Sequence, residues 1–93
     1  MTPHEAVAAA IIDAQRALMG HVAIKLAEKV PSISFDDAGK PSINGDGVSA
    51  VDALVREYSS ITGPLGVRMC FNAAKPVLDQ HVDVKIPSFS SLS

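Results

Sequence analysis

Cysteine, tryptophan and runs of like charge are scarce or absent in this 93-residue chain. The one cysteine, Cys70, cannot form an internal disulfide, so no disulfide framework holds the chain together. This cysteine usage favours a reducing compartment, and we expect a cytoplasmic protein. Eight basic and ten acidic residues give a net charge of -2, whereas a nucleic-acid binder usually carries a basic patch. We therefore predict no nucleic-acid partner.

Long apolar runs are also missing. The richest run, residues 6–12, is followed by Asp13 and Arg16, whereas a membrane span needs about 20 apolar residues. His4 and Glu5 stand where a signal peptide would carry lysine or arginine. We therefore predict no membrane partner and no signal peptide.

What the chain does contain is a high share of hydrophobic residues, 47%, with many alanines among them. This content is too high for intrinsic disorder, and the length allows one domain. We expect a single small helical domain over residues 1–87. Residues 88–93 are rich in serine and should form a mobile tail, unless Ile86, Phe89 and Leu92 dock against the domain.

The strongest helix signal covers residues 2–30. Thr2 and Glu5 match a capping box, which satisfies backbone N–H groups at a helix start. Pro31 marks the end, because the residue before a proline disfavours the α conformation. Gly20 lies inside this predicted helix, where glycine costs about 1 kcal/mol relative to alanine.

Two rows of large apolar side chains run along this predicted helix, about 100° apart. Its polar residues fill only a narrow strip, so most of the circumference is apolar or small. Either the rest of the chain covers the two rows, or a second copy or another protein does. We favour the second explanation and predict a homodimer or higher oligomer, with these interface residues: Val7, Ile11, Ile12, Leu18, Met19, Val22 and Leu26.

The remaining segments complete the fold prediction, which is mainly α. A long N-terminal helix packs on a helical hairpin broken at Gly63-Pro64, with helices over residues 48–61 and 64–75. Residues 33–43 form a small β-hairpin or an irregular loop, and Pro76 ends or kinks the last helix. Residues 82–87 alternate like a strand and form a C-terminal extended segment.

The sequence contains little evidence for a metal site or a catalytic nucleophile. Residues 42–53 resemble a calcium loop in their glycine and Asn/Asp positions, but Ala53 stands where the bidentate carboxylate is needed. The three histidines have no ligand spacing such as i, i+4. Cys70 lies among apolar neighbours and is expected to be a core residue. We therefore predict no metal, no cofactor and no enzyme activity.

A helix-turn-helix is the remaining candidate for DNA binding. Its recognition helix would carry only Arg68, Asn72 and Lys75 as polar base-reading residues, on an otherwise apolar surface. Such a helix is typical of a buried position, so we do not favour this interpretation.

Two function hypotheses remain. The first is a non-catalytic, self-associating interaction or regulatory module. We consider signalling as a setting for this module; the string from Tyr58 to Gly66 (YSSITGPLG) is similar to small helical appendages of bacterial signalling proteins, but so short a motif transfers no function. The alternative is a protein that binds a small apolar ligand or cofactor in a pocket between helices, lined by Tyr58, Met69, Cys70 and Phe71.

Overall fold

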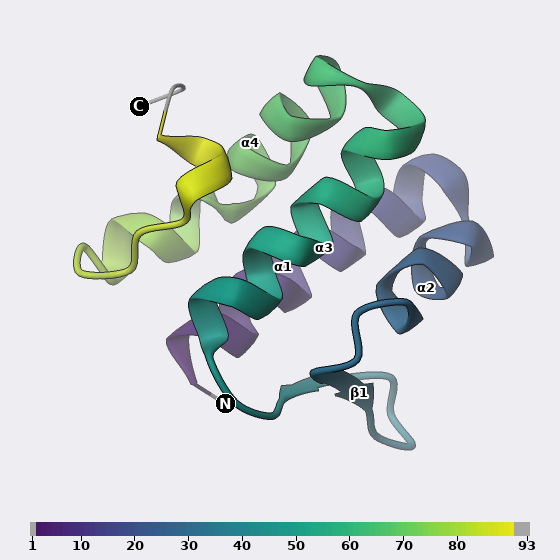
Figure 1. The fold of residues 1–93 in the computed structure, drawn as a ribbon, viewed down its shortest axis with the longest axis horizontal. Coiled ribbons are helices and arrows are strands. Elements are labelled where there is room, and N and C mark those ends of the chain that lie inside the picture. The colour runs from purple at the N-terminus through teal and green to yellow at the C-terminus, as the bar shows by residue number, and fades with distance from the viewer. Residues whose placement is uncertain (1, 91–93) are drawn as a thin grey trace.

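The computed structural model describes residues 2–90 and confirms a mainly α fold (Figure 1). Its elements, in chain order, are α1 Pro3–Met19, α2 His21–Glu28, β1 Ile33–Phe35, β2 Pro41–Ile43, α3 Gly47–Thr62, α4 Pro64–Gln80 and the 3-10 turn η1 Pro87–Phe89. Helix α1 contacts α2, α3 and α4, so the other helices surround it.

Helix α1 begins as the sequence predicts but ends earlier. The Thr2 hydroxyl accepts a hydrogen bond from the Glu5 amide at 3.1 Å, and the Glu5 carboxylate accepts one from the Thr2 amide at 2.9 Å. The prediction of one continuous helix over residues 2–30 is wrong. Gly20 has φ +63° and ψ -137°, a combination that only glycine adopts readily, and it separates α1 from α2.

The β-hairpin over residues 33–43 is confirmed. β1 and β2 pair antiparallel, with Ser34 opposite Ser42. One carboxylate oxygen of Asp36 accepts hydrogen bonds from two backbone amides and shapes the turn between the strands. Glu5 in α1 accepts a hydrogen bond from the Ile43 amide at 2.8 Å, which ties the hairpin to the start of the first helix.

The predicted helical hairpin is also confirmed, with a break at Gly63. Asp46 caps α3, because its carboxylate accepts hydrogen bonds from the Ser49 amide and hydroxyl. Helix α4 runs on through Pro76 to Gln80, so of the two alternatives at Pro76 the helix does not end there but continues. Pro76 and Asn72 are both exposed, and water can therefore reach the carbonyl that the proline leaves without an amide donor.

The core lies between α1, α3 and the two flanking helices. Its largest fully buried side chains are Tyr58, Ile11, Leu54, Gln15, Val7, Val51, Val55 and Cys70. Most of them come from α1 and α3, so these two helices supply the centre of the molecule.

Residues 81–90 fold back over α3 and α4. Ile86 is extended, but within residues 2–90 this segment pairs with neither strand, so the strand-like alternation does not produce a strand. Val84, Ile86 and Phe89 are buried, whereas Val82 is exposed. A mobile tail was expected unless Ile86, Phe89 and Leu92 dock against the domain. Ile86 and Phe89 do dock, while Leu92 lies outside the described residues.

The helices within residues 2–90 are at most 17 residues long. None of them combines the length and the apolar character that crossing a bilayer requires.

Candidate functional site

The seven predicted interface residues separate into two groups. Val7, Ile11, Ile12 and Leu26 are buried inside this chain by the packing of the other helices. They are therefore core residues and offer no surface to a partner, so our preferred explanation of the two rows does not hold for these four. Leu18 and Val22 are about half exposed and Met19 is half-buried, so these three remain at the surface.

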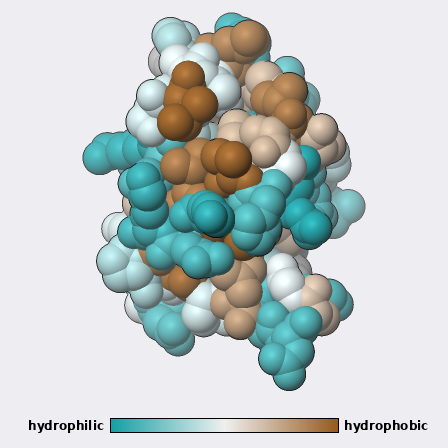
Figure 2. Space-filling model, turned by 90° about the vertical axis from the view of Figure 1, so that its right-hand side faces the viewer, coloured by the Kyte–Doolittle hydropathy of each residue, from teal (hydrophilic) through white to brown (hydrophobic). Residues whose placement is uncertain are grey.

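Leu18 and Val22 are among the exposed large apolar side chains of residues 2–90. Leu18 and Val22 flank Gly20, and Ile61 and Leu65 flank Gly63; the four side chains are between 50% and 65% exposed. We call them the corner patch. Both glycine corners lie on the right of Figure 1, and the view of that side in Figure 2 shows apolar groups gathered above a band of hydrophilic ones. Exposed apolar groups gathered on one face are typical of a binding surface.

The corner patch exists because both helical connections use a glycine in the same way. Gly20 and Gly63 have nearly equal φ values, +63° and +67°, and each joins two helices with no further loop residue. A sharp turn of this kind leaves the last turn of one helix and the first turn of the next without a covering element. Their apolar side chains therefore remain in contact with solvent.

The four predicted ligand residues do not line one cavity. Tyr58 is fully buried, and its hydroxyl donates a hydrogen bond to the Ala23 carbonyl at 2.8 Å. Cys70 is also fully buried, as expected for a core residue, and Met69 is half-buried. Only Phe71 reaches a groove, which lies beside the C-terminal half of α4.

Burial also sets the chemistry of Tyr58 and Cys70. Desolvation raises the pKa of the Cys70 thiol to about 11, although a hydrogen bond from the Gln15 amide at 3.5 Å acts in the opposite direction. The pKa of Tyr58 is raised by burial first and by the neighbouring Cys70 second. A thiol with this pKa is protonated near neutral pH, and the protonated form is a poor nucleophile.

Gln15 is the one fully buried polar side chain of α1. Its amide nitrogen contacts Cys70, but its carbonyl oxygen has no hydrogen-bond partner within residues 2–90. Neither the periodicity nor the composition distinguished this glutamine from the exposed polar residues of the same helix.

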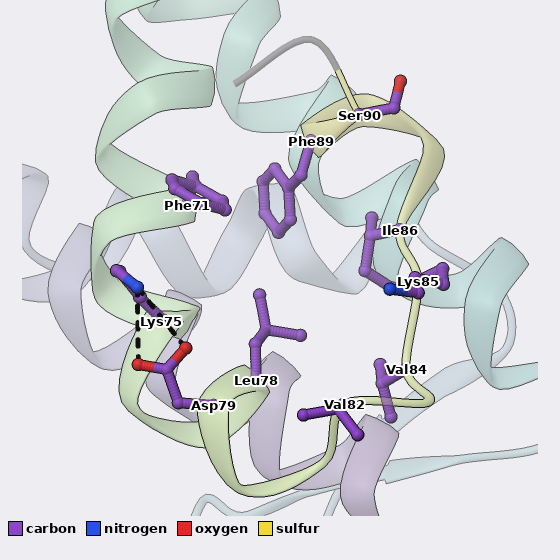
Figure 3. A pocket seen from close by; sticks show the side chains of 10 residues that line it. All are labelled: Phe71, Lys75, Leu78, Asp79, Val82, Val84, Lys85, Ile86, Phe89 and Ser90. Carbon is purple, nitrogen blue, oxygen red and sulfur yellow. Dashed lines mark hydrogen bonds and ion pairs between the residues drawn. The ribbon is translucent and has the colours of Figure 1, made fainter. Parts of the chain in front are cut away.

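The groove beside α4 has a volume of about 630 Å³ (Figure 3). Pockets that hold small ligands have volumes of about 300–1,000 Å³. Phe71 and Phe89 form an edge-to-face pair at its upper wall, with ring centroids 5.4 Å apart. The other apolar lining residues are Leu78, Val82, Val84 and Ile86.

Charged side chains surround this apolar interior. Lys75 and Asp79 on α4 form an exposed ion pair at 3.4 Å, and Lys85 lies on the opposite side of the groove (Figure 3). Lys85 is exposed and makes no ion pair with any residue of the described range. The groove therefore combines an apolar interior with a cation, Lys85, that has no ion-pair partner within residues 2–90.

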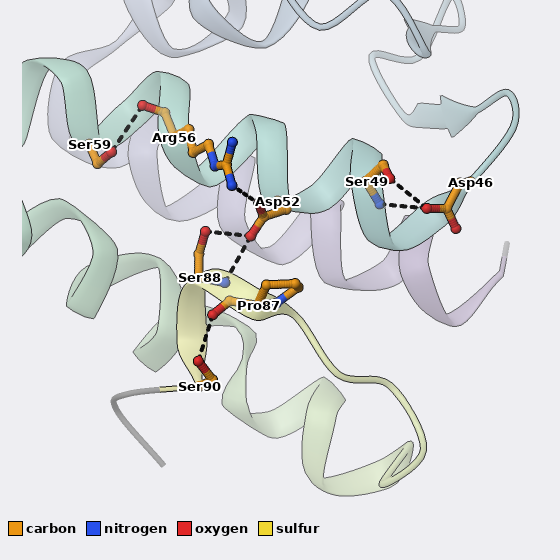
Figure 4. A network of polar contacts seen from close by, with 8 residues as sticks. All are labelled: Asp46, Ser49, Asp52, Arg56, Ser59, Pro87, Ser88 and Ser90. Carbon is orange, nitrogen blue, oxygen red and sulfur yellow. Dashed lines mark hydrogen bonds and ion pairs between the residues drawn. The ribbon is translucent and has the colours of Figure 1, made fainter.

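A buried carboxylate fixes the wall of the groove that η1 provides (Figure 4). Asp52 on α3 accepts hydrogen bonds from the amide and the hydroxyl of Ser88, the first of them at 2.8 Å. Its second oxygen pairs with Arg56 at 3.0 Å. Because Ser88 precedes Phe89, these contacts hold the aromatic ring against α3 and α4.

The sequence contained part of the signal for the groove. The alternation of Val82, Val84 and Ile86 predicted an extended segment with one apolar face; Val84 and Ile86 are buried, whereas Val82 is exposed. The contact between Asp52 and Ser88 spans 36 residues, so no local pattern could reveal it. Within residues 2–90, no group of three or more His, Cys, Asp and Glu side chains is placed to hold a metal ion.

Three comparisons with known proteins complete the description of the site. No family model, no curated protein and no solved structure matches this chain. The function is therefore argued from the chain's own residues.

Proposed function

We propose that this protein is a non-catalytic, self-associating interaction module, with a regulatory or signalling role. The observation that supports the proposal is the corner patch, in which two glycine corners expose Leu18, Val22, Ile61 and Leu65 on one side of the molecule. An apolar surface of this kind can bind a partner, but it supplies no acid, base or nucleophile for catalysis.

A second copy of the chain is the partner that this surface suits best. Apolar side chains have no charge sign to match, so the same patch on two subunits is self-complementary in a two-fold dimer. The dimer thus forms through the exposed ends of helices α1 to α4. It does not use the buried rows of α1.

Substitution of Leu65 tests the proposal. In a two-fold dimer, Leu65→Ser removes two buried leucines, each worth about 1.5 kcal/mol, so the dimer dissociation constant should rise roughly a hundredfold. Analytical ultracentrifugation at micromolar concentration measures this change. Val82→Ser is the matched control, because Val82 is 77% exposed but lies near the other end of α4.

Two results would contradict self-association through this patch. The first is that the unsubstituted chain sediments as a monomer up to about 100 micromolar. At that concentration a dimer of micromolar affinity would contain nearly all of the protein. The second is that Leu65→Ser and Val82→Ser weaken the dimer equally, because the interface would then lie elsewhere.

Binding of a small apolar ligand is a second candidate function, and the groove beside α4 favours it. The residues that support it are not the four expected from the sequence. Of those four only Phe71 lines the groove, together with apolar residues of α4 and the C-terminal segment. This binding does not depend on the corner patch, because the two features lie at opposite sides of the ribbon in Figure 1.

A further inference from the structure

The interior of the groove is suited to one apolar chain. Six apolar side chains line it, and they come from α4, from the segment after it and from η1. The volume of about 630 Å³ lies within the range for small ligands. The wall that carries Phe89 is held by the Asp52–Ser88 contacts, so the shape is fixed before a ligand enters.

The rim of the groove selects a charge. Lys75 is partly neutralised by Asp79, while Lys85 has three N–H donors and no ion-pair partner within residues 2–90. One negative group is therefore favoured beside Lys85. A second is not, because Asp79 and the carbonyl groups of the last turn of α4 add negative potential on the other side.

We propose that the groove binds a single-chain amphipathic monoanion, of which a medium-chain carboxylate is the simplest example. The alkyl chain lies between the Phe71–Phe89 pair and Leu78, and the carboxylate accepts hydrogen bonds from Lys85. This inference rests on the second candidate function and names its ligand class. It is independent of self-association through the corner patch.

Methyl NMR titration with decanoate and with decan-1-ol tests the inference. Both ligands should shift the methyl signals of Leu78, Val84 and Ile86, while Val7 and Ile11 in the core stay unchanged. Decanoate should bind about threefold more tightly than decanol, because an exposed ion pair contributes about 0.2–1 kcal/mol. This preference should shrink in high salt, which screens exposed charges.

Substitutions at the rim assign the charge preference to Lys85. Lys85→Gln should weaken decanoate binding about threefold, and Lys85→Glu should weaken it further because the same position then repels the carboxylate. Lys85→Gln should leave the affinity for decanol unchanged, because the alcohol carries no charge. Lys40→Gln, which removes an exposed lysine of the hairpin turn, is the matched control.

The outcomes separate the inference from the function on which it rests. Equal binding of decanoate and decanol overturns the monoanion but keeps the apolar-ligand function. Absence of binding by both ligands overturns both. Binding to vesicles of phosphatidylglycerol without a saturable shift by free decanoate overturns the single-chain ligand and assigns the groove to a lipid surface.

Discussion

Cys70 shows how burial controls a single residue. The thiol lies in the core between α1 and α4, in contact with Gln15, and desolvation is the main reason that its pKa is raised to about 11 from an ordinary value of 9.0. Below pH 9 the folded and unfolded states both hold the proton. Between pH 9 and 11 the unfolded state loses it first, so folding stability falls as pH rises.

This linkage gives a prediction at the residue scale. The free energy of unfolding should decrease by about 2–3 kcal/mol more between pH 9 and 11 in the unsubstituted chain than in Cys70→Ala. Urea unfolding at several pH values measures the difference. Burial, the main cause of the raised pKa of Tyr58, is present in both proteins, so most of the contribution of Tyr58 cancels in the comparison. Parallel stability curves would show that the thiol titrates equally in both states.

At the scale of elements, the glycine corner between α1 and α2 determines the architecture. The sequence pattern over residues 2–30 is helical throughout, and Gly20 alone interrupts it. A continuous helix would place α2 along the α1 axis, away from α3. The turn at Gly20 instead brings α2 against α3, where Ala23 accepts the hydrogen bond from Tyr58.

Gly20→Ala distinguishes the corner from a continuous helix by the sign of its effect. At φ +63° an alanine is strained, so the substitution should destabilise the protein by about 1–3 kcal/mol. In a continuous helix the same change would stabilise it by about 1 kcal/mol. No atom lies within 4 Å of the added Cβ atom, so the change in stability reports the backbone strain and not a steric clash. Chemical unfolding gives the sign directly.

At the scale of the whole molecule, the C-terminal segment completes the core. Val84, Ile86 and Phe89 are buried although they follow the last α-helix, and Ser88 is hydrogen-bonded to Asp52. A small domain buries a limited share of its surface, so three apolar side chains are a large part of its stability. Each contributes about 1.5–3 kcal/mol when fully buried.

Truncation tests this contribution. A chain that ends at Gln80 should lose about 4–9 kcal/mol and unfold without a cooperative transition, because small domains are stable by only about 5–15 kcal/mol. The full chain, which retains all three side chains, should unfold in one cooperative transition. Thermal unfolding followed by circular dichroism compares them. Equal midpoints for both chains would show that residues 81–90 add nothing to the core.

Features that depend on neighbours along the chain could be predicted without the fold. The capping box at Thr2, the hairpin turn at Asp36 and the break at Gly63-Pro64 each follow from side-chain and backbone chemistry within a few residues. For the same reason, the helical class and most helix starts were predictable.

Only the tertiary structure decided which apolar residues remain for binding. Periodicity placed Val7 and Leu18 on one apolar row, yet the first is buried by the other helices and the second is half exposed. Whether such a side chain is core or surface depends on which element packs over it. The groove likewise arises where η1 returns to α3 through Asp52 and Ser88, a contact that only folding creates.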